Sequence, residues 1–270
     1  MNLDRIWTLM GKELREFRAS PAALAPVVLL VVICTVLPFL VVVAVPWGTG
    51  QSLTSDKTFL QVLTLARQRT PDLAALPVAV AAEVFLLQQF LLLYLIAPIL
   101  GAVSLAAYSV VGEKQGRTLE PLLTTPMSTA EILIAKVLAS FLPSLVIEVI
   151  GLCLYFATIA AIAAPGVGWS LLSLRSVLLV GLLGPFSSLA ALQATIAVSS
   201  RVNDPRSAQQ VAVLVVLPLI GMLLGQIAGA FFITTPILLA LSVGMAAVWV
   251  LLIFLSIALF ERETILTRWS

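Results

Sequence analysis

Long apolar segments separated by short polar ones account for most of this chain. Each apolar segment is long enough to cross a hydrocarbon core of about 30 Å as a helix, because a helix rises about 1.5 Å per residue. Their approximate bounds are 21–45, 83–108, 132–160, 172–198, 208–230 and 236–260. We therefore predict an all-α integral membrane protein with six transmembrane helices in residues 21–270.

The first 20 residues alternate apolar and charged positions with the period of a helix. The apolar stripe consists of Leu3, Ile6, Trp7, Met10, Leu14 and Phe17. Charged side chains occupy the opposite side, which is typical of a helix that lies in the membrane interface. We predict an amphipathic interfacial helix over 1–20; the alternative is a charged tail without regular structure.

The polar segment 48–82 separates the first two predicted spans and is too short to form a folded domain. Within it, four apolar residues recur at helical spacing, namely Phe59, Leu60, Leu63 and Ala66. We expect a helix from Thr58 to Gln68 that contributes to a small cap over one end of the spans.

The longest polar interruption between apolar segments runs from Gly112 to Lys136. Three leucines at helical spacing follow its first charges, at Leu119, Leu122 and Leu123. Thr125-Pro126 then breaks the pattern, because proline cannot continue a helix that precedes it. Ser128 and Glu131 have the spacing of a capping box, in which each side chain accepts a hydrogen bond from the other residue's backbone amide. The pattern predicts a short amphipathic helix, a rigid turn and a capped new helix.

The same stretch resembles the loop between the second and third spans of ABC-2 type transporter permeases. The residues that carry the resemblance are Glu113-Lys114-Gln115, Thr118-Leu119-Glu120, Leu122-Leu123, Thr125-Pro126-Met127-Ser128, Glu131-Ile132-Leu133 and Lys136. The sequence departs from the family pattern at Arg117-Thr118, where Gly-Thr is frequent, and at Ala135, where glycine usually precedes the lysine. The alternative is an amphipathic loop of another class of polytopic membrane protein.

In ABC-2 permeases this loop forms a coupling helix that rests on a separate ATPase subunit. The resemblance implies that coupling to an ABC ATPase involves Glu113, Arg117, Leu119, Glu120, Leu122 and Leu123. It also implies that the N-terminal helix is an elbow helix and that a second permease, an identical copy or a homologous chain, completes the transporter. ATP and magnesium would then be bound by the partner ATPase, with no cofactor on this chain.

Composition agrees with a membrane protein and argues against several classes of enzyme. With 61% hydrophobic and 10% charged residues, a water-soluble globule would expose apolar surface on every side. Histidine is absent from the sequence, which removes the commonest general base and metal ligand. Cys34 and Cys153 each stand alone within an apolar segment. We expect no catalytic residue and no metal site.

Charge and motif content narrow the function further. A net charge of +2 without a basic patch argues against a nucleic-acid partner. The glycine-rich GxxxxGK[ST] loop that binds nucleotide phosphates does not occur in the sequence. If transport is driven by ATP, we therefore expect the hydrolysing site on another chain.

The distribution of basic residues predicts the orientation in the membrane. Of the 15 lysines and arginines, 11 fall on the side of the two termini. These 11 are Arg5, Lys12, Arg15, Arg18, Lys114, Arg117, Lys136, Arg201, Arg206, Arg262 and Arg268. The positive-inside rule then predicts a multi-pass protein of the inner (plasma) membrane with both termini in the cytoplasm.

Polar side chains inside predicted spans are candidates for a substrate path. Glu148 lies within the third span, and Gln88 and Gln89 of the second span are possible partners at a similar depth. The alternative is a structural hydrogen bond between helices.

Three glycines at a spacing of four residues, Gly221, Gly225 and Gly229, form a smooth strip in the fifth predicted span. Such a strip lets another helix backbone approach closely. It predicts either a contact between two permeases or packing within one subunit.

These observations favour the membrane subunit of an ATP-driven transporter, an exporter by family resemblance, and not an enzyme. One alternative is a secondary transporter, which should show inverted repeats and broken helices near the midplane. The other is an intramembrane enzyme, which would need several catalytic groups at matched depth.

Overall fold

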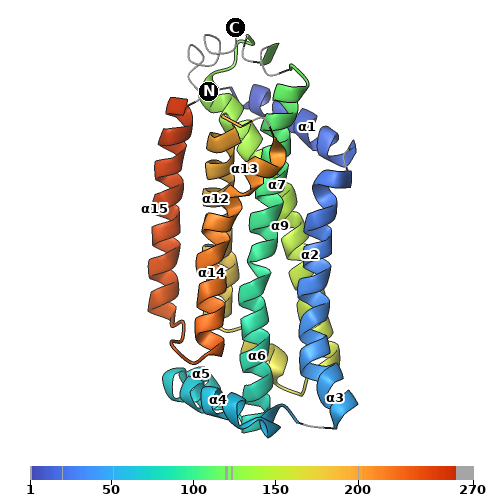
Figure 1. The fold of residues 1–270 in the computed structure, drawn as a ribbon, viewed down its shortest axis with the longest axis vertical. Coiled ribbons are helices and arrows are strands. Elements are labelled where there is room, and N and C mark those ends of the chain that lie inside the picture. Colours follow the sequence, from blue (N-terminus) through green and yellow to red (C-terminus); the bar gives the residue numbers. More distant parts are fainter. Residues whose placement is uncertain are drawn as a thin grey trace.

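Helices make up almost all of the described chain, and most of them run along one long axis (Figure 1). This computed structural model describes residues 2–19, 21–50, 52–118, 121–122, 124–199, 201–202 and 204–259. No β-strand occurs within these ranges. The predicted all-α class is therefore confirmed for this part of the chain.

Five helical segments of the described residues are long and apolar enough to cross a membrane. They are Val27–Thr49, Val78–Gln115, Thr129–Ile162, Leu174–Ser199 and Thr235–Ile257. The remaining predicted span corresponds to α14 (Val211–Ile227), whose described apolar part, Leu214–Ile227, is shorter than the other five. A multi-pass membrane protein is thus confirmed, and a count of six spans stays a prediction.

Two spans are single helices and three are built from shorter pieces. The single helices are α9 (Thr129–Ile162) and α15 (Thr235–Leu259). The first span joins α2 (Pro21–Phe39), a π-helical turn (Leu40–Ala44) and α3 (Val45–Thr49). The second joins α6 (Val78–Tyr94) and α7 (Ile96–Gln115). The fourth joins α11 (Leu174–Leu178), a π-helical turn (Leu179–Leu183) and α12 (Gly184–Ser199).

Each interruption lies beside a proline. Pro98 has no N–H group to donate to the carbonyl of Tyr94, and the helix breaks at Leu95 between the two. Pro38 precedes the first π-helical turn, and Pro185 follows the second. Proline removes one hydrogen bond of the helical ladder, and the neighbouring turn widens or breaks in response.

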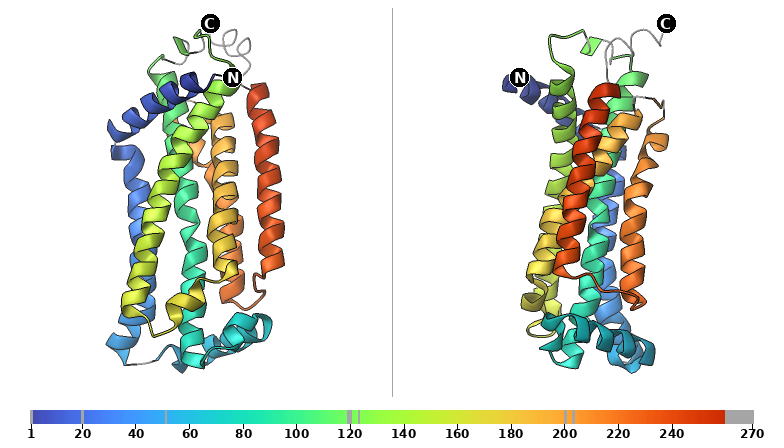
Figure 2. Two further views of the ribbon diagram at one scale, coloured as in Figure 1. Left: turned by 180° about the vertical axis from the view of Figure 1, so that it is seen from behind. Right: turned by 90° about the vertical axis from the view of Figure 1, so that its left-hand side faces the viewer.

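The second span is longer than the predicted range 83–108, since its helices run from Val78 to Gln115. The predicted range stops at Tyr108, but the helix continues through the charged residues Glu113 and Lys114, which are buried among other helices. This span is the centre of the bundle. In its most apolar stretch of 18 residues, 78% of the residues are buried, against 11% in the corresponding stretch of the Thr235–Ile257 span. Helices α2, α9 and α12 pack around α7, and α15 lies outermost against α12 (Figure 2).

Short helices cover the end of the bundle opposite to α1 (Leu3–Ala19). They are α4 (Lys57–Arg69), α5 (Pro71–Ala74) and α10 (Val167–Leu171). The predicted helix over 58–68 is confirmed as α4, and it begins where the Asp56 carboxylate accepts from the backbone amides of Thr58 and Phe59. Those hydrogen bonds lower the pKa of Asp56. We call this end of the bundle the α4 end, and the opposite one the α1 end.

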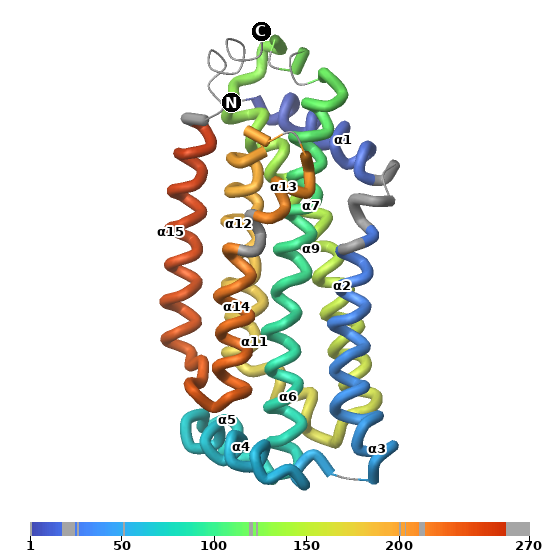
Figure 3. Tube along the Cα trace, in the orientation of Figure 1, coloured from blue at the N-terminus to red at the C-terminus, as the bar shows by residue number. Residues whose placement is uncertain are grey.

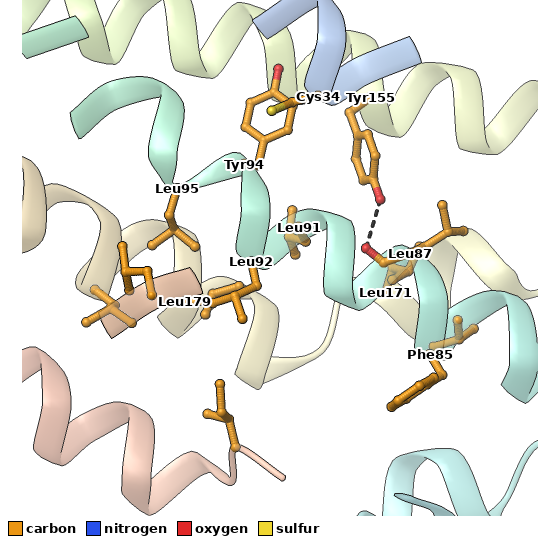
Figure 4. Packing of buried hydrophobic residues seen from close by; sticks show 14 of the residues in the cluster. Cys34, Phe85, Leu87, Leu91, Leu92, Tyr94, Leu95, Tyr155, Leu171 and Leu179 are labelled. Carbon is orange, nitrogen blue, oxygen red and sulfur yellow. Dashed lines mark hydrogen bonds between the residues drawn. The ribbon is translucent and has the colours of Figure 1, made fainter. Parts of the chain in front are cut away.

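Two tyrosines fill the space between α2, α6 and α9 (Figure 4). The Tyr155 hydroxyl donates to the Leu87 carbonyl at 2.9 Å, and the Tyr94 hydroxyl lies 3.3 Å from the Thr35 hydroxyl. The Tyr94 side chain reaches the α9 backbone at Gly151, where an added Cβ would lie 1.9 Å from the Tyr94 hydroxyl oxygen and 2.5 Å from Val31 Cγ1. Only glycine leaves room for this close approach.

We predict that Gly151→Ala destabilises the protein by about 1–3 kcal/mol, the usual effect of overpacking a filled core. Tyr94→Phe removes the atom nearest to the added methyl group and should restore part of the loss in the double variant. Thermal unfolding of the purified protein in detergent measures both effects. A Gly151→Ala variant as stable as the parent would show that this contact is not tight.

Candidate functional site

Helix α1 lies across the ends of α7 and α9 at the α1 end of the bundle (Figure 2). Ile6 and Leu9 pack with Met127, Ile132 and Ala135 around the start of α9. Further along, Met10 and Phe17 pack with Leu105 of α7 and Ala139 of α9. The apolar residues of α1 thus attach it to two spans.

The predicted apolar stripe of α1 therefore divides into two parts. Ile6, Met10 and Phe17 are buried against the spans, whereas Leu3 and Trp7 are 62% and 60% exposed. The expectation that all charged residues of α1 face away from the apolar surroundings is wrong for Glu13, which is fully buried. Glu13 is buried because a lysine from another helix binds it.

A network of buried charges joins α1, α7 and α9. Lys136 of α9 has no exposed surface, and its Nζ lies 2.8 Å from Glu113 Oε2 and 3.0 Å from Glu13 Oε1. It also donates to the hydroxyl of Ser109 at 2.8 Å. Lys12 of α1 lies 2.8 Å from the other carboxylate oxygen of Glu113. We call Lys12, Glu13, Glu113 and Lys136 the charge junction.

The charge junction contains two cations and two anions, so its formal charge is zero. Burial lowers the pKa of Lys12, but its hydrogen bond to Glu113 and the nearby carboxylates outweigh that effect and raise the pKa overall. Removing Lys136 would leave two buried carboxylates with only the partly exposed Lys12 nearby, which costs more than the intact network contributes. The junction therefore specifies how the three helices meet.

The loop after α7 starts from this junction. Gly112–Gln115 form the last turn of α7, so they are not part of the predicted coupling helix. The chain turns at Arg117, which is exposed and has a φ of 54°, and the Thr118 amide donates to the Glu113 carbonyl at 2.9 Å. Leu122 packs on the apolar cluster of Ile6 and its neighbours. The other predicted coupling residues, Leu119, Glu120 and Leu123, lie outside the described residues.

The position of Glu113 requires a revision of its predicted role. It is 4% exposed, and both of its oxygens face lysines of the same chain. A direct contact with a partner protein does not fit this arrangement. The junction cannot be predicted from local sequence patterns, because Lys12 and Lys136 are distant from Glu113 along the chain.

The start of α9 is fixed as the sequence predicts. The Ser128 hydroxyl accepts from the Glu131 amide at 3.2 Å, and the Glu131 carboxylate accepts from the Ser128 amide at 2.9 Å. The other oxygen of Glu131 accepts from the Asn2 amide, and Arg5 donates to the Pro126 carbonyl. The turn before α9 and the start of α1 thus hold each other in place.

Lys114 makes a second link at the α1 end. Its Nζ donates to the carbonyls of Ser199 at 3.2 Å and Val202 at 2.8 Å, where α12 ends. A cation at a helix C-terminus binds carbonyls that lack partners within the helix. The last turn of α7 therefore binds three neighbouring elements through Glu113 and Lys114.

The structure places Glu148 and Gln88, two of the predicted substrate-path residues, in different surroundings. Glu148 is 3% exposed, and its Oε1 would lie 3.6 Å from a Cβ added at Gly184, next to Leu95. It therefore lies where the break of the second span meets the π-helical turn of the fourth. Gln88 instead lines a small cavity with Arg175 and Gln226, and the Oε1 of Gln89 is buried without a hydrogen bond to any other described residue.

Arg175 and Gln226 form an interhelical contact that sequence analysis did not pair. The Arg175 guanidinium donates to Gln226 Oε1 at 2.9 Å, and that oxygen also accepts from the Ile233 amide at 3.3 Å. The contact joins α11 to the connection between α14 and α15. The two residues are 51 positions apart, and no local pattern relates them.

The three glycines do not form one interhelical strip. Gly229 lies beyond α14 with a φ of +70°, and the amides of Gly229 and Ala230 donate to the carbonyls of Gln226 and Gly225. This pattern is a Schellman cap, which favours glycine at the left-handed position. An added Cβ at Gly225 would lie 2.3 Å from Phe231, whereas one at Gly221 would meet none of the described residues within 4 Å. Gly225 and Gly229 thus serve the end of their own helix, and Gly221 remains open to a neighbour.

Comparison with known proteins adds one finding to this geometry. The family described as "ABC-2 family transporter protein" matches residues 7–235. A search of curated proteins found no match.

Within the described residues, no group of three or more acidic or cysteine side chains could hold a metal ion.

We predict that Lys136→Met destabilises the protein by about 3–5 kcal/mol, because Glu13 and Glu113 then lose their shared buried cation. Adding Glu13→Gln should recover part of this loss, since Glu113 keeps Lys12. Arg15→Met, at an exposed position of α1, is the control and should have little effect. Thermal unfolding in detergent tests all three, and equal stability of Lys136→Met and the parent would contradict the prediction.

Proposed function

The chain belongs to the ABC-2 transporter family, and from this premise we propose that it is the permease subunit of an ATP-driven exporter. Its energy would come from a separate ABC ATPase that binds ATP and magnesium. The sequence contains no phosphate-binding loop of its own, which supports a division of labour between two kinds of subunit. Hydrolysis on the ATPase would move this chain, and the chain itself would catalyse no reaction.

The arrangement in the membrane follows from the helices and the basic residues. We propose six spans with α14 as the fifth, α1 as the elbow helix, and the α1 end in the cytoplasm of the cell's inner membrane. A second permease copy or a homologous permease would complete the path. The open side of α14 at Gly221 is compatible with such a partner.

The observation that carries the proposal is the charge junction at the base of the loop. Glu113 in the last turn of α7 binds Lys136 of α9 and Lys12 of α1. A force on the loop would therefore reach all three helices at once. In this role Glu113 transmits movement from inside the subunit, and residues further along the loop would meet the ATPase.

Those residues form the proposed coupling helix and its approach. Arg117 is exposed at the turn, and Leu122 is half-buried at the edge of the apolar cluster. In the sequence, Leu119 and Glu120 lie between Arg117 and Leu122, and Leu123 follows Leu122. These three residues would complete the contact with the ATPase. Apolar side chains would be buried against the ATPase, while the charges would orient it.

The mechanism would be a rigid-body one. When the ATPase pair closes on nucleotide, the two coupling helices would approach each other. Because α1, α7 and α9 are joined at the junction, they would tilt together and open the path at the α4 end. Helix pairs that are locked at one end transmit displacement better than independent helices.

We predict that Leu122→Asp lowers ATP-driven transport about ten-fold or more, because a charge replaces apolar contact at the interface. ATP hydrolysis by the partner should continue without being coupled to transport, and membrane insertion should be unchanged. Leu60→Asp, at a half-buried leucine of α4 at the opposite end, is the matched control.

The measurement is transport into vesicles that contain the permease and its copurified ATPase. Transport by Leu122→Asp at the parental rate would contradict the coupling role. Transport by the permease alone, without any ATPase, would contradict the proposed function and favour a secondary transporter.

A further inference from the structure

Figure 3 shows α4 beside the connection of α14 to α15 at the α4 end. A cavity of about 320 Å³ is lined by residues of these two segments. Its lining includes Leu65, Arg69, Ala230, Phe231, Phe232 and Ile237. This volume is at the lower end of the range for small-molecule sites. The cavity lies at the level where α14 ends and α15 begins, where we expect the boundary between hydrocarbon and headgroups.

The walls of the cavity are apolar and its rim carries one cation. Leu65, Phe231 and Ile237 are each more than 40% exposed, although they face the cavity. Arg69 is exposed and forms no ion pair or hydrogen bond with another described residue. An apolar hollow beside a free guanidinium is complementary to a molecule with an apolar tail and an anionic head.

The rim opposite α4 is held in a fixed shape. The Schellman cap at Gly229 ends α14, and Phe231 closes over Gly225. The Ile233 amide is bound to Gln226, which Arg175 also contacts. The cavity is therefore formed before any ligand arrives, which lowers the entropic cost of binding.

A second cavity provides a comparison within the same molecule. It also has a volume of about 320 Å³, and it lies at the α4 end between α9 and α10. Its lining includes Phe156, Ala163 and Trp169, and none of its lining residues is charged. The two cavities thus share size and apolar walls and differ in the presence of an arginine.

We propose that the cavity beside Arg69 binds an anionic phospholipid, with an acyl chain along the apolar walls and the phosphate on the Arg69 guanidinium. The lipid would join α4 to α15, two helices whose described residues make few or no direct contacts with each other. It stabilises the outermost helix of the bundle at its α4 end. This inference does not depend on ATP coupling and holds for the isolated permease.

The test measures lipid retention by the purified full-length protein. The protein is exchanged into detergent with equal amounts of phosphatidylglycerol and phosphatidylcholine of the same chain length, and bound lipids are counted by native mass spectrometry. We expect about five-fold preferential retention of phosphatidylglycerol, the effect of one basic residue on an anionic headgroup. Arg69→Gln should abolish this preference, and Lys57→Gln, at the other end of α4, should keep it.

A second pair of variants separates the two cavities. Ala230→Phe fills the cavity beside Arg69 and should lower phosphatidylglycerol retention, whereas Ala163→Phe fills the uncharged one and should not. Inorganic phosphate should fail to displace the lipid, because the acyl chain contributes to binding. Unchanged preference in Arg69→Gln, equal retention of the two lipids by the parent, or displacement by phosphate would each overturn the proposal.

Discussion

Charge neutralisation at Lys136 is the constraint on which the α1 end of this protein depends. An ammonium group with no exposed surface is too costly to leave unpaired, so carboxylates must be brought to it. Glu13 comes from a helix that precedes the first span, and Glu113 comes from the last turn of the second. This requirement fixes the angle of α1, the length of α7 and the direction in which the loop leaves. The apolar clusters around Ile6 and Met10 then close around the paired charges.

Local features of this fold could be predicted from the sequence, and distant pairings could not. The caps at Asp56 and Ser128 are encoded within four residues, and the spans by runs of apolar side chains. The charge junction joins residues up to 123 positions apart, and a sequence does not show which charge faces which. Glu113 was for that reason assigned to a partner although it is buried in its own subunit. Gly225 and Gly229 were equally ambiguous, because glycine serves both helix caps and helix contacts.

Two irregular parts of the spans lie next to each other inside the bundle. The break at Leu95 and the π-helical turn before Gly184 face each other, and the buried Glu148 lies beside them. The ion pairs among the described residues, by contrast, lie at the α1 end. The bundle thus has a tightly bonded base and a less regular centre, an arrangement suited to a chain that is pushed at one end and must deform further along.

The order of the residues in the charge junction also bears on how the protein is made. A chain grows from its N-terminus, so Glu13 and Glu113 are synthesised before Lys136. Both carboxylates are therefore present on α1 and α7 when α9 is synthesised. Lys136 can then form its ion pairs with Glu13 and Glu113 as soon as α9 is in place, and it need not be exposed to lipid as an unpaired cation.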